Sequence, residues 1–182
     1  PVMSRITRKR KEDIGLSPYE MKFRGQKKVE KTTMELFDFN LDFVHELPVK
    51  SPDKLTAYQT KDTISWLNVD GLDDVTLMKK LAEIFRIDNN IMSEIMNPAG
   101  RPKVQEFEEG LLVTLKMLQI NERTNKLGVE NLSLVIKNDF LISFQEDKGD
   151  FFDTVRERIR KHKNKIRTAG PDYLAFALLD MV

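Results

Sequence analysis

Apolar and polar residues alternate in several short segments of this 182-residue chain, and such alternation is typical of half-buried β-strands. Residues 33–39 alternate in this way. Residues 63–69 are predicted as another strand, which Asp70 and Gly71 would end. Further strands are predicted at residues 111–120, 130–136 and 140–144. The last two are separated by only three residues, so we expect them to form an antiparallel hairpin.

Apolar residues spaced three to four positions apart predict two helices in the middle of the chain. The first would begin after Asp73 or Asp74, because aspartate suits the N-cap position. The second would begin at Asp88, and at 100° per residue it turns Ser93 and Glu94 toward its polar side. Its apolar side consists of Ile91, Met92, Ile95 and Met96.

The C-terminal part is predicted to be helical and ends on an apolar segment. One helix is indicated by the spacing of Phe152, Val155, Ile159 and Ile166. A second helix would start near Pro171, because proline suits the first turn. Residues 173–182 are apolar nearly all round, so this helix must pack against something, and no glycine or basic residue marks its end. We therefore interpret the chain as cut from a longer protein within this helix.

Composition limits the class of protein. Lysine and arginine total 30 and aspartate and glutamate total 29, so net charge recruits neither nucleic acid nor an anionic membrane. The absence of cysteine fits a reducing compartment. No segment approaches the roughly 20 apolar residues of a membrane-spanning helix, and the first residues lack the apolar core of a signal peptide. We predict a soluble intracellular protein.

Three regions follow from these patterns. Residues 1–17 are rich in basic and poor in apolar residues, so we interpret them as a flexible arm, with a nucleic-acid-binding tail as the alternative. Residues 18–148 hold the predicted strands and the first two helices, and residues 149–182 form a helical segment. Strands mixed with helices, together with antiparallel links, predict an α/β or α+β fold.

The residues of common catalytic sites are missing or scattered. The two histidines, His45 and His162, lie far apart and are interpreted as surface residues. Without cysteine or a histidine pair at ligand spacing, a structural zinc site is excluded. No two of the eight glycines lie closer than ten residues apart, which excludes a phosphate-binding glycine loop, and there is no Gly-x-Ser-x-Gly motif. We predict that the chain is not an enzyme.

A run of basic residues is the main competing signal. It consists of Arg156, Arg158, Arg160, Lys161, Lys163, Lys165 and Arg167. We interpret this run as a solvated helix face, and contact with an acidic element of a partner chain is the alternative. Because no aromatic residues interleave with these charges, we expect no nucleic acid as a partner.

Several segments together resemble the cytoplasmic domain of the CorA-type magnesium and cobalt transporters. The matching segments are residues 64–72 (ISWLNVDGL), 101–104 (RPKV), 115–118 (LKML), 132–136 (LSLVI), 140–146 (FLISFQE), 155–160 (VRERIR) and 172–180 (DYLAFALLD). They occur in the family's order and spacing across residues 64–182, whereas residues 1–60 match only in general character. The family's Gly-Met-Asn signature belongs to its membrane segment and is not found in this chain.

The resemblance implies a mixed parallel and antiparallel sheet sandwiched between helices, followed by helices that lead into a stalk. It also implies a homopentamer at the cytoplasmic face of the cell membrane, touching the membrane only through helices that this chain lacks. Members bind divalent cations between subunits, and bound cation keeps the channel closed. Mg²⁺ would be both the regulatory and the transported ion, with Co²⁺ as a possible further cargo. The fragment alone is expected to be a monomer or weak oligomer.

The resemblance also implies which residues bind the regulatory cation. The family places an acidic pair at Ser93 and Glu94 and an aspartate at Asp180, with further ligands in the stalk beyond Val182. Oxygen ligands suit Mg²⁺, which uses one or two carboxylates and keeps several waters. Ser93 departs from the family pattern, so one acidic ligand is missing. The alternatives are a solvated surface position for Glu94 and a salt bridge to lysine or arginine for Asp180, whose unpaired burial would be costly.

Two other functions stay open at this point. The related zinc-transporting family shares the fold, and its selectivity filter would lie outside this chain. A different class is a stand-alone adaptor or nucleic-acid-binding domain that uses the basic helix. A pair of hydrophobic spans with Gly-Met-Asn after Val182 in the parent protein would exclude the adaptor.

Overall fold

A computed structural model of the chain describes residues 20–59, 62–121, 126–149, 151–161 and 165–182. Its centre is a seven-stranded sheet in the order β2-β1-β3-β7-β6-β5-β4. The strands are β1 (Thr33–Phe39), β2 (Val44–Pro48), β3 (Ile64–Asp70), β4 (Lys103–Phe107), β5 (Gly110–Asn121), β6 (Lys126–Ile136) and β7 (Phe140–Gln145). Only β3 and β7 run parallel, and every other pair of neighbours is antiparallel.

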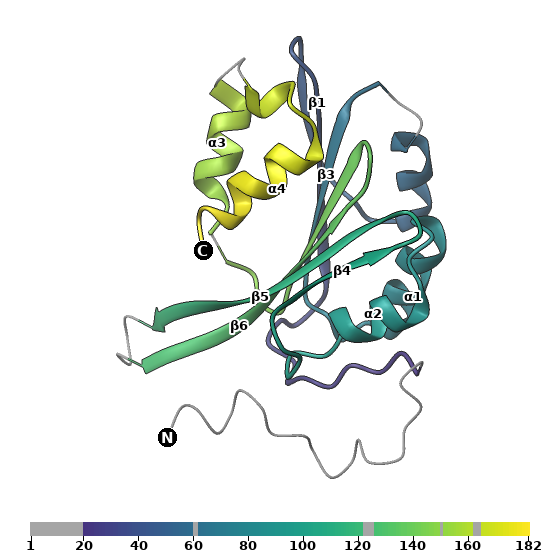
Figure 1. The fold of residues 1–182 in the computed structure, drawn as a ribbon, viewed down its shortest axis with the longest axis vertical. Coiled ribbons are helices and arrows are strands. Elements are labelled where there is room, and N and C mark those ends of the chain that lie inside the picture. Colours follow the sequence, from purple (N-terminus) through teal and green to yellow (C-terminus); the bar gives the residue numbers. More distant parts are fainter. Residues whose placement is uncertain (1–19, 60–61, 122–125, 150, 162–164) are drawn as a thin grey trace.

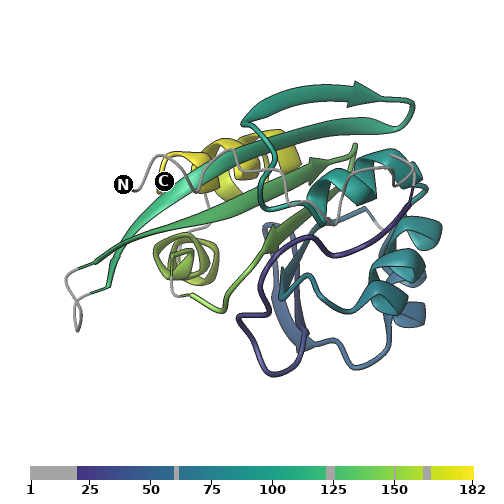
Figure 2. The same ribbon diagram turned by 90° about the horizontal axis from the view of Figure 1, so that it is seen from below.

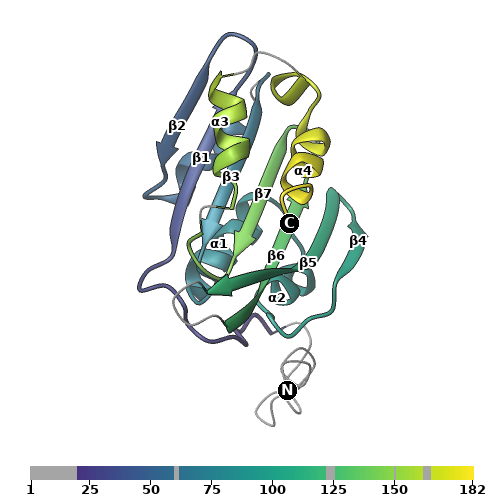
Figure 3. The same ribbon diagram turned by 90° about the vertical axis from the view of Figure 1, so that its left-hand side faces the viewer.

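The helices lie in the sequence between and after the strands. They are α1 (Val75–Ile84), α2 (Asn89–Ile95), α3 (Asp153–Lys161) and α4 (Pro171–Leu179), with 3₁₀ helices η3 (Pro52–Tyr58) and η4 (Lys165–Arg167). Helices α1 and α2 cover one face of the sheet, and α3 and α4 cover the other (Figures 1 and 3). The expected mixed sheet between helices is therefore confirmed. Among the described residues, no helix is long and apolar enough to cross a bilayer.

The first two strand predictions are confirmed to within one residue. The segment 33–39 is β1, and 63–69 differs from β3 by one residue at each end. Strands β6 and β7 form the predicted antiparallel hairpin. The five-residue strand β4 was not predicted. It is short, and although its burial alternates, its apolar Val104 is 67% exposed while the polar Lys103 and Gln105 take the more covered positions, so hydrophobicity does not mark its covered face.

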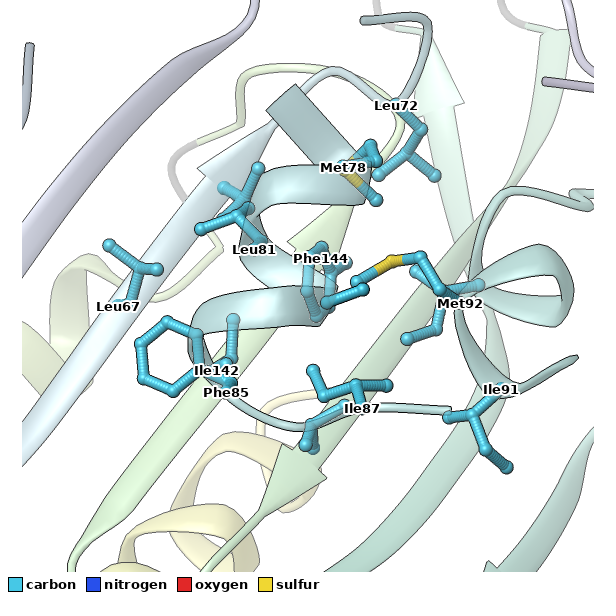
Figure 4. Packing of buried hydrophobic residues seen from close by; sticks show 14 of the residues in the cluster. Leu67, Leu72, Met78, Leu81, Phe85, Ile87, Ile91, Met92, Ile142 and Phe144 are labelled. Atoms are coloured by element: carbon cyan, nitrogen blue, oxygen red, sulfur yellow. The ribbon is translucent and has the colours of Figure 1, made fainter. Parts of the chain in front are cut away.

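The first core lies between the sheet and α1 and α2. All four residues of the predicted apolar side of α2 are fully buried. Figure 4 shows side chains of α1 and α2 directed toward Ile142 and Phe144 of β7. Asp74 is the N-cap of α1, and its side chain accepts a hydrogen bond from the Leu77 N–H at 2.9 Å. Capping and periodicity therefore act together to position this layer.

The second core lies between the sheet and α3 and α4. Phe37 and Trp66 stack with ring centroids 5.2 Å apart, and Phe152 meets Trp66 edge-on at 5.8 Å. The apolar residues predicted for this helical region, Phe152, Val155, Ile159 and Ile166, are all fully buried. Their helical spacing thus correctly predicted the buried side of this helical region.

Helix α4 differs in part from the predicted helix at residues 173–182. It ends at Leu179, with Asp180 as its C-cap. Its buried residues include Leu174, Ala175, Ala177 and Leu178. Phe176 is 62% exposed, so the all-round apolar helix is covered by its own chain on one side only.

The hairpin of β5 and β6 extends past the other strands (Figure 2). Pairing of β4 with β5 reaches only Thr114, and pairing of β7 with β6 stops at Leu132. The outer part is therefore a two-stranded ribbon, on which Leu118 is 62% exposed. The predicted arm, residues 1–17, lies outside the described residues.

Candidate functional site

Glu94 lies in the last turn of α2, and its side chain is 39% exposed. It forms an ion pair with Lys103 of β4, and Lys103 also donates to Gln105 Oε1 at 2.8 Å. Burial lowers the pKa of Lys103. Glu94 does lie outside the buried side of its helix, as expected, but it is a paired carboxylate and not a simply solvated one.

Ser93 was predicted to lie on the polar side of α2, and this was wrong. Ser93 is 2% exposed, and its hydroxyl donates to the backbone carbonyl of Glu20 at 3.2 Å. The N-terminal segment covers this side of α2, because Phe23 packs on the same core and the Arg24 N–H donates to Met96 O at 3.1 Å. The position of Ser93 on a helical wheel cannot show that another segment of the chain covers it.

Asp180 is exposed at the C-terminal end of α4. Its backbone N–H donates to Phe176 O at 2.9 Å, which closes the helix. Within the described residues no lysine or arginine forms an ion pair with its carboxylate, so the alternative of a salt bridge is not observed there. Because the carboxylate is exposed, the burial cost that suggested a partner does not arise.

Glu94 and Asp180 lie on opposite sides of the sheet, since α2 belongs to the first core and α4 to the second (Figure 1). In the described part of the chain no three histidine, aspartate or glutamate side chains come together to hold a metal ion. One copy of the chain therefore does not bring the two candidate carboxylates together.

The basic run is not a uniformly solvated helix face, and that prediction was wrong for Arg156 and Arg167, which are buried. Arg156 is 7% exposed, and its guanidinium lies 5.5 Å from the ring centroid of Trp66 and 5.9 Å from that of Phe37. It donates to Asp153 Oδ1 at 2.7 Å and lies 3.7 Å from Glu35. An arginine over aromatic rings gains cation–π attraction and packs its stem at the same time.

Two more arginines bind elements of the same chain. Arg160 forms two parallel hydrogen bonds to the Glu46 carboxylate, at 2.6 and 2.9 Å, which hold α3 to β2. Arg167 is buried and donates to the carbonyls of Ile159 and Arg160 at 2.6 and 2.8 Å, so it satisfies the free C-terminal end of α3. These contacts leave fewer charges available for an acidic partner.

His45 is the histidine that the structure describes. His45 is exposed on β2 and stacks with Phe43 at a centroid distance of 4.6 Å, which confirms its interpretation as a surface residue. His162 lies outside the described residues.

Two buried carboxylates near the base of the β5–β6 hairpin were not singled out from the sequence. Glu130 and Glu146 are 6% and 7% exposed, and Lys28 lies 3.3 and 3.1 Å from them. Burial raises the pKa of Glu130 despite the nearby lysine. The missed signal was alternation, which places Glu130 on the same face as the buried Leu132.

A further buried carboxylate, Asp70, ends β3. It is 8% exposed and accepts a hydrogen bond from Asn68 Nδ2 at 2.9 Å. Burial raises the pKa of Asp70 to about 6, although the bond from Asn68 and the charge of Arg156 act in the opposite direction. This carboxylate lies close to the end of the sheet that α3 covers.

A hollow of about 1150 Å³ opens at the other end of the sheet, around the β6–β7 turn and the start of α4. Its basic residues are already paired, because Glu109 lies 3.0 Å from Arg86 and 2.8 Å from Lys137. Neither Glu94 nor Asp180 lines it.

Comparison with known proteins identifies relatives of this chain. A family model described as "CorA-like Mg2+ transporter protein" matches residues 61–182. The chain is 30% identical over 166 residues to the cobalt/magnesium transport protein CorA of Thermotoga maritima, a match covering 91% of this chain and 47% of the relative. The chain thus spans about half the length of the curated relative it matches.

Solved structures share the fold at low sequence identity. The soluble domain of CorA from Methanocaldococcus jannaschii is similar with a TM-score of 0.58 and 17% identity, over 80% of this chain and 54% of that one. The ZntB cytoplasmic domain from Vibrio parahaemolyticus is similar with a TM-score of 0.56 and 12% identity, over 82% of this chain and 57% of that one. At these identities the likeness establishes the fold alone.

Proposed function

The chain belongs to the CorA-like Mg²⁺ transporter family, and we propose that it is the cytoplasmic regulatory domain of a magnesium or cobalt channel. In this proposal, carboxylates shared between subunits bind intracellular cation, and the bound cation keeps the pore closed. Because the family consists of transporters, the expectation that the chain is not an enzyme is confirmed.

The observation that carries the proposal is the position of the two carboxylates. Glu94 and Asp180 lie at the surface on opposite sides of one sheet, so a cation that uses both must lie between two copies. Head-to-tail contacts that repeat around a ring bring one side of each copy against the other side of the next. A homopentamer with its cation sites between subunits would satisfy this requirement.

The chemistry of both residues supports a weakly held, hydrated cation. Asp180 is an exposed carboxylate without an ion pair among the described residues, and Mg²⁺ binds such oxygens while keeping most of its waters. Glu94 is neutralised by Lys103, whose pKa is lowered by burial. An arriving cation would replace the lysine as the partner of Glu94, and this competition would keep the affinity low.

The zinc-transporting alternative rests on fold likeness to ZntB at 12% identity. The 30% identity to a cobalt/magnesium transport protein favours magnesium or cobalt as the cargo. The stand-alone adaptor is disfavoured, because Arg156, Arg160 and Arg167 are engaged within the chain. We therefore retain a channel at the cytoplasmic face of the cell membrane as the proposed setting.

The test uses the full-length protein in vesicles, with internal magnesium varied and external magnesium fixed. Glu94→Gln and Asp180→Asn should each raise the internal magnesium needed for half-inhibition, while transport without internal magnesium stays normal. Glu83→Gln and Asp139→Asn are matched controls, because both carboxylates are exposed and lie on α1 and on the β6–β7 turn. Inhibition curves that match the parent protein in both test variants, with assembly confirmed, would refute the assignment.

A further inference from the structure

A row of polar side chains interrupts the apolar face of the sheet beneath α3. The ladder places Glu35, Asn68 and Ser143 side by side across β1, β3 and β7. The next row toward the carboxyl ends of the parallel pair contains Asp70 and Gln145. Alternation puts these residues on the face that α3 and α4 cover. Figure 3 shows α3 lying over β1 and β3 on this face.

These side chains form a directed chain of hydrogen bonds that ends on a carboxylate. Trp66 Nε1 donates to Ser143 Oγ at 2.9 Å, and Ser143 Oγ donates to Asn68 Oδ1 at 2.6 Å. Asn68 Nδ2 then donates to Asp70 Oδ1 at 2.9 Å. Asp70 is thus the terminal acceptor of a buried network, and its protonation state is the one variable in that network.

The side chain of Gln145 lies beside Asp70, and its amide is buried. Its side chain is fully buried, and neither its amide oxygen nor its amide nitrogen has a hydrogen-bond partner among the described residues. Asp70 and Gln145 are paired in the parallel ladder, so their side chains leave the same face about 5 Å apart. A protonated Asp70 carries the donor that the buried amide oxygen lacks.

The charged groups that face Asp70 come from three neighbouring segments. Arg156 faces it from α3, Lys148 from the loop after β7, and Glu35 from β1. Arg156 is the buried one of the three, and within the described part of the chain its Nε has no hydrogen-bond partner. Its other contacts are the Asp153 carboxylate at 2.7 Å and Glu35 at 3.7 Å.

We propose that Asp70, Gln145 and Arg156 form a proton-operated latch between α3 and the carboxyl ends of β3 and β7. With Asp70 protonated, its hydroxyl donates to Gln145 Oε1, and Arg156 stays with Asp153 and Glu35. When the proton leaves, a negative charge lies beneath α3 and draws the Arg156 guanidinium from Glu35 toward the strand ends. The two protonation states therefore favour different positions of α3 on the sheet.

The titration range makes such a latch responsive near neutral pH. Burial raises the pKa of Asp70 to about 6, Glu35 adds to the rise, and Asn68, Arg156 and Lys148 oppose it. Since α3 leads through η4 to α4, a shift of α3 reaches the helix that ends at Asp180. This last step rests on the proposed function, whereas the latch itself does not.

The latch is tested on the chain in solution by NMR between about pH 4 and about pH 8. The Asp70 carboxyl carbon should titrate with a midpoint near 6, and the α3 backbone amides of Val155 and Arg156 should shift with the same midpoint. Asp70→Asn should abolish the α3 titration, and Arg156→Met should raise the Asp70 midpoint because a nearby positive charge is lost. Asp139→Asn is the control and should leave the α3 titration unchanged.

The outcomes separate the latch from the regulatory site. An Asp70 midpoint near the usual aspartate value of about 4 would overturn the latch. So would α3 amides that do not titrate with Asp70, or that still titrate in Asp70→Asn. Because none of these measurements involves magnesium or transport, their failure leaves the Glu94 and Asp180 assignment untouched.

Discussion

On the face that α1 and α2 cover, the core is mainly aliphatic, aromatic and methionine side chains, with isolated buried polar pairs such as Ser65 and Asp38. Under α3 and α4 the apolar core is crossed by an arginine and a polar row. Phe85 and Phe140 pack at a centroid distance of 4.6 Å on the first side. On the second side the Trp66 ring is covered by the guanidinium of Arg156. Both sides bury large side chains, and the α1/α2 face also buries Asp38, which accepts a hydrogen bond from Ser65 Oγ at 2.9 Å. Within the described residues, the buried arginines Arg156 and Arg167 lie on the second side.

The difference indicates separate tasks for the two sides. Apolar burial is non-directional and depends little on pH, so the apolar core under α1 and α2 stabilises the fold under all conditions in which the chain is native. Buried hydrogen bonds and charges depend on protonation and on geometry, so the α3/α4 side can change with conditions. The following predictions test this contrast between the two sides, in decreasing order of expected effect.

Phe144→Ala should destabilise the core under α1 and α2. Phe144 is fully buried, and truncation of a buried phenylalanine costs about 3–5 kcal/mol of unfolding free energy. The loss should be the same at pH 5 and pH 8, because no titratable group is removed. Urea unfolding at both pH values measures it. A loss below about 1 kcal/mol, or one that changes strongly with pH, would contradict the assignment of an apolar structural core.

Arg156→Met should weaken the α3/α4 side by about 2–3 kcal/mol, because it removes a buried charge, its hydrogen bond to Asp153 and its contact with the Trp66 ring. Arg156→Lys should not restore the loss, since an ammonium lacks the planar fork that donates while lying over the ring. Thermal unfolding at neutral pH compares the two variants. Full stability of Arg156→Lys would show that charge alone matters at this position.

Asp70→Asn should stabilise the chain at pH 8 by roughly 1–2 kcal/mol, since the asparagine stays neutral where the buried carboxylate must ionise. The folded-state pKa of about 6 lies above the usual aspartate value, so the folded chain binds this proton more tightly than the unfolded chain. Stability from this group is therefore present at low pH and lost as pH rises toward and through 6. Unfolding free energies of both proteins should converge near pH 4, and a constant difference at all pH values would refute the linkage.

Glu94→Gln should change the stability of the chain least, by less than about 1 kcal/mol, because its pair with Lys103 is partly exposed. Salt at about 1 M should remove most of that difference. Urea unfolding with and without salt provides the measurement. A loss above about 2 kcal/mol would mean that Glu94 holds the fold together, and changes in magnesium inhibition in Glu94→Gln could then no longer be attributed to a lost ligand.

Local pattern in the sequence determined most of the elements and the family. Alternation identified β1, helical spacing identified the buried side of α2, and the aspartate before Val75 identified the cap of α1. These features are visible in one stretch of chain because strand and helix periods are short. The likeness to CorA-type proteins was recognised from segments spread over residues 64–182, and the family match covers residues 61–182.

Only the tertiary structure decided which polar residues are buried and which partners they have. The bond between Ser143 and Asn68 joins residues 75 positions apart, and the bonds between Arg160 and Glu46 join residues 114 positions apart. Such pairs depend on strand order, register and the placement of α3, none of which a local period encodes. The same reason explains why Ser93 is buried under the N-terminal segment and why Glu94 and Asp180 lie on opposite sides of the sheet.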